Sequence, residues 1–395
     1  MRIGMVTACY IPVQNGITRM VSLYKKHLEL AGHEVFVFTI GPKSEHRESG
    51  TIISSPGFRY RKSGYFISFR YNRRARQLLK QMDLIHCHHP LLGLELSRRY
   101  ASCPIVFTSH TRYDLYTAAL TPIPGKAANR ISSYLIPIML QKSDWIIAPT
   151  GSMRDLLKGW GVAKPIEVIG NGIELNFYRN PSDLIDRKAI GIAEDGVTAI
   201  YVGRLSPEKG VDTLLSAYSI AKTEMPDLSL LLVGDGPSRH KLEKQAVDLK
   251  IRSSVRFIGQ VPFHKIPSYL ALADFFVSAS RTEVHPLTVM EAMAAALPIV
   301  GVRSPGLNGL VEHGKNALLC GKSFDELARG IIDMAGNRNR RLIMSEASVD
   351  ESEKYDIRRT IEMSLNLYYR VLSISRNKLQ EPKSNHRNFL SSLKY

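Results

Sequence analysis

The segment Arg281-Thr-Glu-Val-His-Pro-Leu-Thr-Val-Met-Glu-Ala-Met-Ala-Ala-Ala-Leu-Pro298 decides the fold of this 395-residue chain. It follows the apolar run 273–278, which is typical of a buried strand, and its second half is rich in Ala, Met and Leu, which favour a helix. We therefore expect Glu283 in the loop at the C-terminal end of a strand. Glu291 is expected early in the next helix, since Pro286 is tolerated in a first helical turn. Ligands of open α/β sheets bind at that edge.

The two glutamates, with seven residues between them, admit two interpretations. In the first, Glu283 and Glu291 bind polar groups of a ligand while the first-turn N–H groups of the helix bind a phosphate, as a nucleotide-sugar cradle requires. In the second, the segment is an acidic helix start and Glu291 is a solvated surface residue. The spacing alone does not decide between them.

The composition is that of an ordinary globular protein, with 44% apolar and 23% charged residues. The length predicts two or three domains. No apolar run is long enough to cross a membrane, and residues 1–9 are typical of a first strand rather than a signal peptide. The four cysteines lie far apart without a CxxC pair, which argues against a disulfide scaffold or zinc finger and favours a cytoplasmic location.

Positive charge is concentrated in the first half of the chain. Residues 1–180 contain 24 Lys and Arg against 11 Asp and Glu, which gives +13 of the total net charge of +17. Residues 58–80 contain eight Lys and Arg, six aromatic residues and no acidic residue. Such a stretch suits an anionic membrane surface, or it is a solvated face over core aromatics. A nucleic-acid partner is not expected, although stacking on bases uses the same residue types.

Strand and helix patterns alternate along the chain and then restart. In residues 1–180 this alternation predicts parallel strands joined by helices. It begins again within residues 181–355, after a stretch at 171–196 whose Gly, Pro, Asn and Asp residues suit a linker. We therefore predict an α/β protein with two Rossmann-like domains, 1–180 and 181–355, and a cleft between them. We expect residues 356–374 to form a last amphipathic helix and residues 375–395 to form a disordered basic tail.

Candidate ligand residues of the second domain follow its strands. The loop Gly203-Arg-Leu-Ser-Pro-Glu-Lys-Gly210 places Arg204 and Lys209 at the same sheet edge as Glu283. Arg can bind a diphosphate with two hydrogen bonds, and Lys adds a point charge. The alternative is a surface loop with ordinary charges. Gly234 begins a Gly-Asp-Gly turn, which either lets a nucleotide approach the backbone or only turns the chain.

The first domain contributes three further candidates. Gly16 follows Asn15 in the loop after the first strand and permits close approach of the backbone to a phosphate, although a plain tight turn is an equal alternative. His110 ends a strand and either bonds a sugar hydroxyl or is a structural histidine. The run His86-Cys-His-His89 does not predict a metal site, because consecutive strand residues point to opposite faces. No GxGxxG follows the first strand, which argues against an NAD enzyme.

Together these features resemble glycosyltransferase family 4, retaining group 1 enzymes with the GT-B fold. The likeness covers the chain to about residue 372. It rests on the order and spacing of these motifs: 10–16, Gly32-His-Glu-Val35, Asp83-Leu-Ile-His-Cys-His88, Thr108-Ser-His110, Asn171-Gly-Ile173, Gly203-Arg204 with Lys209-Gly210, Gly234-Asp-Gly236, and the pair Glu283 and Glu291. The resemblance implies two Rossmann-like domains, a cleft between them, and a C-terminal helix that crosses back to the first domain.

The resemblance also implies roles for the candidates in the second domain. Arg204 and Lys209 would bind the donor diphosphate and stabilise the leaving nucleotide. Glu291 would bind the ribose hydroxyls, and Glu283 would contact the donor hexose. The helix start at Pro286 and Leu287 would bring backbone near the sugar and phosphate.

From the first domain, Gly16 would approach the diphosphate and His110 would hold the transferred sugar. Family members are thought to let a donor phosphate oxygen take the acceptor proton, so neither a catalytic carboxylate pair nor a metal cofactor is expected. The implied activity is retaining transfer of a hexose from a nucleotide sugar, of the UDP-glucose type or GDP-mannose, to a hydroxyl of a membrane lipid or glycan. We expect this at the inner face of the membrane, with the protein in the cytoplasm.

Two departures and two rival functions remain. The family often has Gly where Ala296 stands. If this position needs φ > 0, Ala is less stable there than Gly by roughly 1 kcal/mol, so we expect the turn to differ slightly. His285 follows Glu283 where small or aromatic residues are common, which puts the donor sugar in doubt. The rivals are a GT-B epimerase or hydrolase of UDP-sugars, and a non-enzymatic binder of anionic surfaces or nucleic acid.

Overall fold

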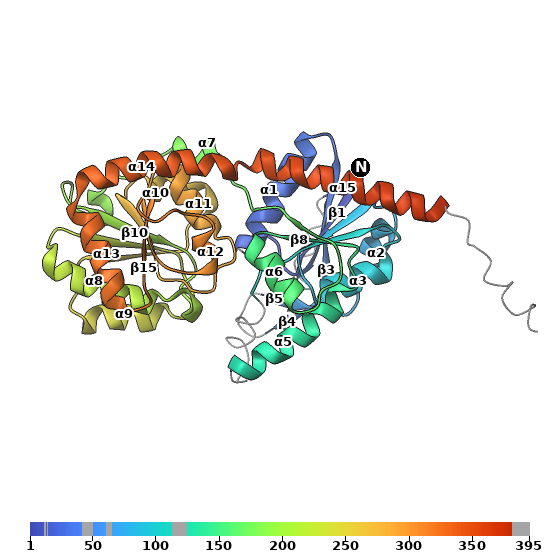
Figure 1. The fold of residues 1–395 in the computed structure, drawn as a ribbon, viewed down its shortest axis with the longest axis horizontal. Coiled ribbons are helices and arrows are strands. Elements are labelled where there is room, and N and C mark those ends of the chain that lie inside the picture. The colour runs from blue at the N-terminus through green and yellow to red at the C-terminus, as the bar shows by residue number, and fades with distance from the viewer. Residues whose placement is uncertain (12, 14, 42–49, 61–64, 113–124, 381–395) are drawn as a thin grey trace, which may run out of the picture.

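The protein folds into two α/β lobes joined by a linker and by a long C-terminal helix (Figure 1). The structure, a computed structural model, describes residues 1–11, 13, 15–41, 50–60, 65–112 and 125–380. Each lobe contains one parallel sheet. The predicted pair of Rossmann-like domains is therefore confirmed.

The first sheet has seven strands in the order β3-β2-β1-β6-β7-β8-β9, and all neighbouring pairs are parallel. The sheet is formed by β1 (Arg2–Val6), β2 (Glu34–Gly41), β3 (Ile52–Pro56), β6 (Leu84–Cys87), β7 (Ile105–Thr108), β8 (Trp145–Ala148) and β9 (Ile166–Val168). Most of these strands are buried, as continuous apolar runs require when helices cover both faces. Strand order reverses between β1 and β6, which creates a topological switch point at their C-terminal ends.

The helices of this lobe connect consecutive strands. They are α1 (Gly16–Leu30), α2 (Arg73–Leu79), α3 (Leu92–Tyr100), α5 (Gly125–Leu140) and α6 (Gly151–Gly159). Asn15 caps α1, because its side chain accepts from the backbone N–H of Thr18. Met20, Val21 and Leu28 recur on the buried face of α1, as the helical spacing predicts.

The second sheet has six parallel strands in the order β12-β11-β10-β13-β14-β15, with its switch point between β10 and β13. Its strands are β10 (Thr198–Val202), β11 (Ser229–Val233), β12 (Val255–Gly259), β13 (Phe275–Ser278), β14 (Ile299–Val302) and β15 (Ala317–Cys320). The helices are α8 (Val211–Glu224), α9 (Arg239–Asp248), α10 (Ile266–Leu270), α11 (Leu287–Ala294), α12 (Pro305–Asn308), α13 (Phe324–Gly336) and α14 (Arg338–Ser352).

The linker and the last helix tie the lobes together. The linker contains the short helix α7 (Leu175–Arg179), and α15 (Ile357–Gln380) runs from the second lobe across the first (Figure 1). Tyr368 of α15 is fully buried and bonds Nδ1 of His86 on β6 at 2.6 Å. One hydrophobic cluster accordingly includes residues of both lobes, the linker and α15.

The structure differs from the sequence prediction in four places. The last helix continues to Gln380, so residues 375–380 belong to it rather than to the predicted disordered tail, and 381–395 lie outside the described residues. Strands β3 and β15 were not predicted, and neither was the hairpin of β4 (Phe58–Tyr60) and β5 (Tyr65–Ile67). Among the described residues, no helix is long and apolar enough to cross a bilayer.

Candidate functional site

The switch point of the second sheet brings Lys209 and Glu283 together. Lys209 lies in the loop after β10 and Glu283 in the loop after the neighbouring β13, and Nζ of Lys209 forms an ion pair with Oε1 of Glu283. Ser280 also donates from Oγ to the same carboxylate oxygen, at 3.3 Å. The two charged side chains are 23% and 24% exposed, so both remain accessible to a ligand.

Arg204 stands on the same loop as Lys209, and it is exposed. The structure gives its guanidinium no hydrogen bond or ion pair with any described residue. The predicted juxtaposition of Arg204, Lys209 and Glu283 at one sheet edge is therefore present, with Arg204 open to an anion.

Gly234 packs against the loop that begins at Gly203. Its φ is 138°, and a Cβ there would lie 1.9 Å from the carbonyl oxygen of Gly203. Gly236 likewise lies against the backbone of Leu205. These glycines thus allow two strand-end loops to touch each other, and the approach of a nucleotide to Gly234 stays a prediction.

Two helix N-termini face each other across the lobes. Helix α1 begins at Gly16 and α11 at Leu287, with Pro286 as the N-cap residue of α11. A Cβ at Gly16 would lie 3.9 Å from Cδ1 of Leu287, so the two helix starts are in contact range. Both present the positive ends of their dipoles, which suits an anion between them.

Glu291 is buried, and the interpretation of it as a solvated surface residue is therefore wrong. The residue is 5% exposed, within α11. Tyr178 of the linker donates from its hydroxyl to Oε1 of Glu291 at 2.6 Å. Burial raises the pKa of the Glu291 carboxyl, and the guanidinium of Arg19 together with the Tyr178 bond opposes this rise. Its proposed bond to a ribose stays a prediction.

His110 lies just after β7, next to the switch point of the first sheet. Its Nε2 is 2.9 Å from Nδ1 of His88, and the two rings are stacked with centroids 5.2 Å apart. Burial lowers the pKa of His110 to about 4, so the ring is neutral near pH 7. A neutral ring can offer a hydroxyl one hydrogen bond without adding charge to the site.

The neighbouring His86 has protein partners on both ring nitrogens. Nε2 is 2.6 Å from Oγ1 of Thr108, and Nδ1 bonds Tyr368. Among the described residues, no group of three or more His, Cys, Asp or Glu side chains is placed to hold a metal ion. His86, His88 and His110 thus form a packed polar cluster, and Tyr368 of the C-terminal helix bonds to it.

His285 forms hydrogen bonds with the linker. Its ring is 8% exposed, and Nδ1 accepts the backbone N–H of Asn171 at 3.0 Å. The side-chain amide of Asn171 donates to the carbonyl oxygen of His285, also at 3.0 Å. The expectation that His285 alters contacts with the donor sugar finds no support in this geometry.

Sequence reasoning missed Arg19, Tyr178 and Gly306 at this site. Arg19 and Tyr178 reach Glu291 from another lobe and from the linker, and no local pattern signals such pairs. A Cβ at Gly306 would lie 2.5 Å from the carbonyl oxygen of Glu283, so the loop after β14 supports the Glu283 loop. The Ser-Pro-Gly run at 304–306 marks a turn there, which is the only sequence signal for it.

The chain is similar to known glycosyltransferases over nearly its whole length. The family model described as "Glycosyltransferase Family 4" matches residues 14–177, and the model "Glycosyl transferases group 1" matches residues 183–350. The alpha-monoglucosyldiacylglycerol synthase of Streptococcus pneumoniae is 31% identical over 85% of this chain and 77% of its own length. The enzyme of the same name from Acholeplasma laidlawii is 30% identical over 85% of this chain and 89% of its own.

Solved structures agree on the fold. Sucrose-phosphate synthase from Thermosynechococcus elongatus superposes with a TM-score of 0.77 at 18% identity, covering 94% of this chain and 99% of that one. The Anabaena protein HepE in complex with UDP and glucose gives a TM-score of 0.74 at 20% identity, covering 93% and 99%. The chain therefore belongs to glycosyltransferase family 4, the group 1 glycosyltransferases, and has the GT-B fold.

Proposed function

We propose that this protein transfers a hexose, with retention of configuration, from a nucleotide sugar to a hydroxyl of a membrane lipid or glycan. The observation that carries the proposal is the Lys209–Glu283 pair at the switch point of the second sheet, with the exposed Arg204 on the same loop. The donor diphosphate would lie against Arg204, Lys209 and the two facing helix starts, a cationic environment that suits a leaving group gaining charge.

The chemistry asked of the protein is mainly positioning and charge stabilisation. Lys209 and Arg204 would bind the departing diphosphate, and Glu283 would accept hydrogen bonds from the hexose hydroxyls while paired to Lys209. Glu291 would hold the ribose, and neutral His110 would hold the transferred sugar from the first lobe. None of these roles calls for a resident metal, and we expect transfer without one.

The names of the relatives narrow the donor and acceptor. The relatives from Streptococcus pneumoniae and Acholeplasma laidlawii are both named alpha-monoglucosyldiacylglycerol synthase. Others are named D-inositol 3-phosphate glycosyltransferase and GDP-mannose-dependent alpha-(1-6)-phosphatidylinositol monomannoside mannosyltransferase. We infer a glucose or mannose donor and a glycerolipid acceptor for this chain. An α-linked product from an α-linked donor such as UDP-glucose is retention, which supports that part of the proposal.

A donor and acceptor screen tests the proposal. UDP-glucose, UDP-galactose, UDP-N-acetylglucosamine and GDP-mannose are each incubated with diacylglycerol or glycan acceptors, and the products are quantified by mass spectrometry. The proposal predicts one glycosylated acceptor formed for each nucleoside diphosphate released. Consumption of donor without acceptor would indicate the rival epimerase or hydrolase instead.

We further propose that the first lobe docks on an anionic membrane surface at the inner face. The basic stretch 58–80 supports this in part: Phe58 and Phe69 are 76% and 72% exposed, and Arg70, Arg73 and Lys80 are exposed. Other aromatics serve the core, since Tyr71 is 2% exposed. Residues 61–64 of this stretch lie outside the described residues.

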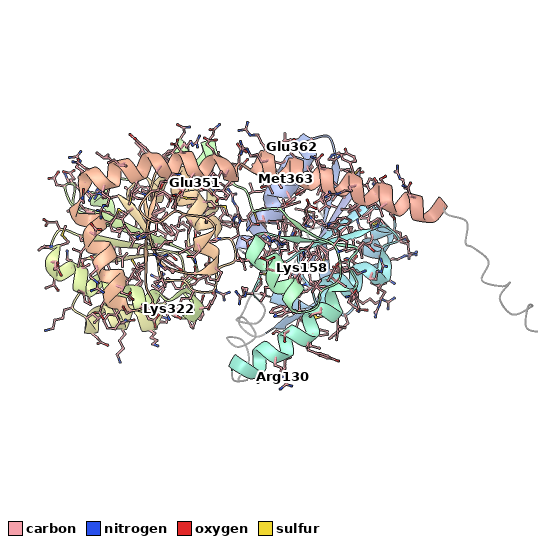
Figure 2. All side chains as sticks on the ribbon, in the orientation of Figure 1. Arg130, Lys158, Lys322, Glu351, Glu362 and Met363 are labelled. Carbon is pink, nitrogen blue, oxygen red and sulfur yellow. The ribbon has the colours of Figure 1, made fainter. Side chains whose placement is uncertain are left out.

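Helix α5 of the same lobe carries an exposed apolar stripe. Ile131, Tyr134, Leu135 and Ile138 recur at helical spacing and are 41%, 71%, 47% and 51% exposed. The helix lies at the outer edge of the first lobe (Figure 1), and Arg130 projects from it (Figure 2). Apolar side chains beside cations match the interface of a bilayer that contains anionic lipid.

Vesicle sedimentation tests this docking. We expect the wild-type chain to bind mixed phosphatidylglycerol and phosphatidylcholine vesicles better than pure phosphatidylcholine, and the double variant Leu135→Asn/Ile138→Asn to lose most binding. Leu342→Asn/Ile343→Asn is the matched control, because these residues are also exposed but lie on α14 of the other lobe. Equal binding to both vesicle types, or undiminished binding by the α5 variant, would contradict the proposal.

A further inference from the structure

A chain of contacts leads from the first lobe to Glu291. Arg19, on α1 of the first lobe, lies with Nη2 3.4 Å from the hydroxyl oxygen of Tyr178 on the linker helix α7. The same hydroxyl donates to Oε1 of Glu291 on α11 of the second lobe, at 2.6 Å. Three parts of the chain thus meet at one carboxylate.

Aromatic rings fix the guanidinium of Arg19 in this position. Its Cζ lies 5.7 Å from the ring centroid of Phe177 on the linker and 5.2 Å from that of Phe263 in the second lobe. Cation–π contacts of this kind are attractive, and more strongly so where the cation is withdrawn from water. Arg19 is therefore inserted from the first lobe between the linker and the second lobe.

The charge of Glu291 depends on this insertion. A carboxylate that is 5% exposed is costly to ionise unless a cation or hydrogen-bond donors compensate. Burial raises the pKa of Glu291, and the groups that oppose the rise are Arg19 and the Tyr178 hydroxyl. The cation comes from a different lobe than the carboxylate, so its effect requires that the lobes be docked.

We propose that Arg19 is a positioning residue that, through Tyr178, orients the Glu291 carboxylate toward the two vicinal hydroxyls of a ribose and so links docking of the lobes to nucleotide binding. This rests on the proposed function, in which Glu291 is the ribose ligand. A carboxylate can accept from both hydroxyls of such a diol when it is ionised and held in one orientation.

The coupling between docking of Arg19 and ribose binding sets how much the loss of Arg19 should weaken nucleotide binding. If docking of Arg19 favours ribose binding, then a bound ribose favours the docked arrangement by the same factor. Couplings of this kind change affinity by roughly 5- to 150-fold, so we expect loss of Arg19 to weaken nucleotide binding by about tenfold. Contacts to the base and diphosphate would not change.

Calorimetric titration of the full chain with two ligands tests the proposal. The ligands are UDP or GDP, whichever the wild type binds, and the matching 2′,3′-dideoxynucleoside diphosphate. We expect Arg19→Met and Tyr178→Phe to weaken binding of the ribonucleotide about tenfold and to leave binding of the dideoxynucleotide unchanged. In donor turnover the same variants should raise KM more than they lower kcat.

Lys26→Met serves as the matched control, because Lys26 also lies on α1 and pairs with the linker, through Glu174 at 2.5 Å, but is 58% exposed. It should bind both ligands as the wild type does. Equal weakening of both ligands by Arg19→Met, or no weakening of either, would overturn the role of Arg19 while leaving the glycosyltransferase function standing. A wild-type chain that binds no nucleoside diphosphate would overturn both.

Discussion

The backbone N–H of Asn171 donates to Nδ1 of His285 at 3.0 Å, which joins the linker to the loop between Glu283 and α11. The side chain of Asn171 returns a second bond to the carbonyl oxygen of His285. The loop that carries Glu283 is thus anchored to the linker. His285 has a structural task, although its place in the sequence suggested contact with the donor.

Replacing His285 with Ala is expected to destabilise the protein without changing donor preference. The variant leaves the N–H of Asn171 without its acceptor, which costs about 1–3 kcal/mol for a buried donor. Urea unfolding measures the loss, and donor competition measures preference. His240→Ala is the control, since that side chain is 99% exposed. A switch in donor sugar with unchanged stability would contradict the structural role.

Stability is expected to fall as the pH drops below about 6.5. Burial lowers the pKa of His86 to about 3 and those of His89, His110 and His285 to about 4. These rings are neutral in the folded chain but take up protons near pH 6.5 once unfolded. The contribution of these neutral rings to the free energy of unfolding is complete above pH 6.5 and is lost as the pH falls toward 4.

Urea unfolding at a series of pH values from 7.5 to 4.5 checks this dependence. The His285→Gln variant should show a shallower fall than the wild type, because one buried histidine no longer titrates. His240→Gln should follow the wild-type curve. Identical slopes for wild type and His285→Gln would show that the ring of His285 does not contribute.

Ala296→Gly is expected to stabilise the protein by about 1 kcal/mol. Ala296 has a φ of 60°, in the left-handed region, and its N–H bonds the carbonyl oxygen of Met293. The N–H of Leu297 bonds the carbonyl oxygen of Ala292, which completes a Schellman turn at the end of α11. The turn at Ala296, which the sequence suggested would avoid positive φ, does have a positive φ, and Ala adopts this strained conformation.

Thermal and urea unfolding measure this gain. The adjacent Ala295 has a φ of −80°, so Ala295→Gly should instead destabilise the protein by about 0.5–1 kcal/mol. Stability changes of opposite sign in Ala296→Gly and Ala295→Gly would show that the effect comes from the backbone conformation. Loss of stability in both variants would contradict the assignment of strain to Ala296.

The sequence predicted those parts of the site that are local in the chain. Arg204, Lys209 and Glu283 each follow an apolar strand, and parallel strands end at a common edge, so their meeting could be foreseen. Helix α11 was predicted from its composition. Strand β15 was not, because its four residues lie between turns without a clear period.

The contacts that cross the lobes could not be predicted in this way. Glu291 meets Tyr178 across 113 residues, and Tyr178 meets Arg19 across 159. Such pairs depend on how the lobes dock, which hydrophobic periodicity does not encode. For the same reason the burial of Glu291 was left open by its spacing from Glu283.

The most direct test of the account is sugar transfer by Lys209→Ala and Glu283→Ala, each checked by circular dichroism and thermal unfolding. We predict that both variants stay folded and lose transfer, because the diphosphate and the hexose lose their ligands at the switch point. Lys158→Ala, an exposed lysine on α6, is the control and should transfer as the wild type does. Full transfer by both site variants would contradict the central claim.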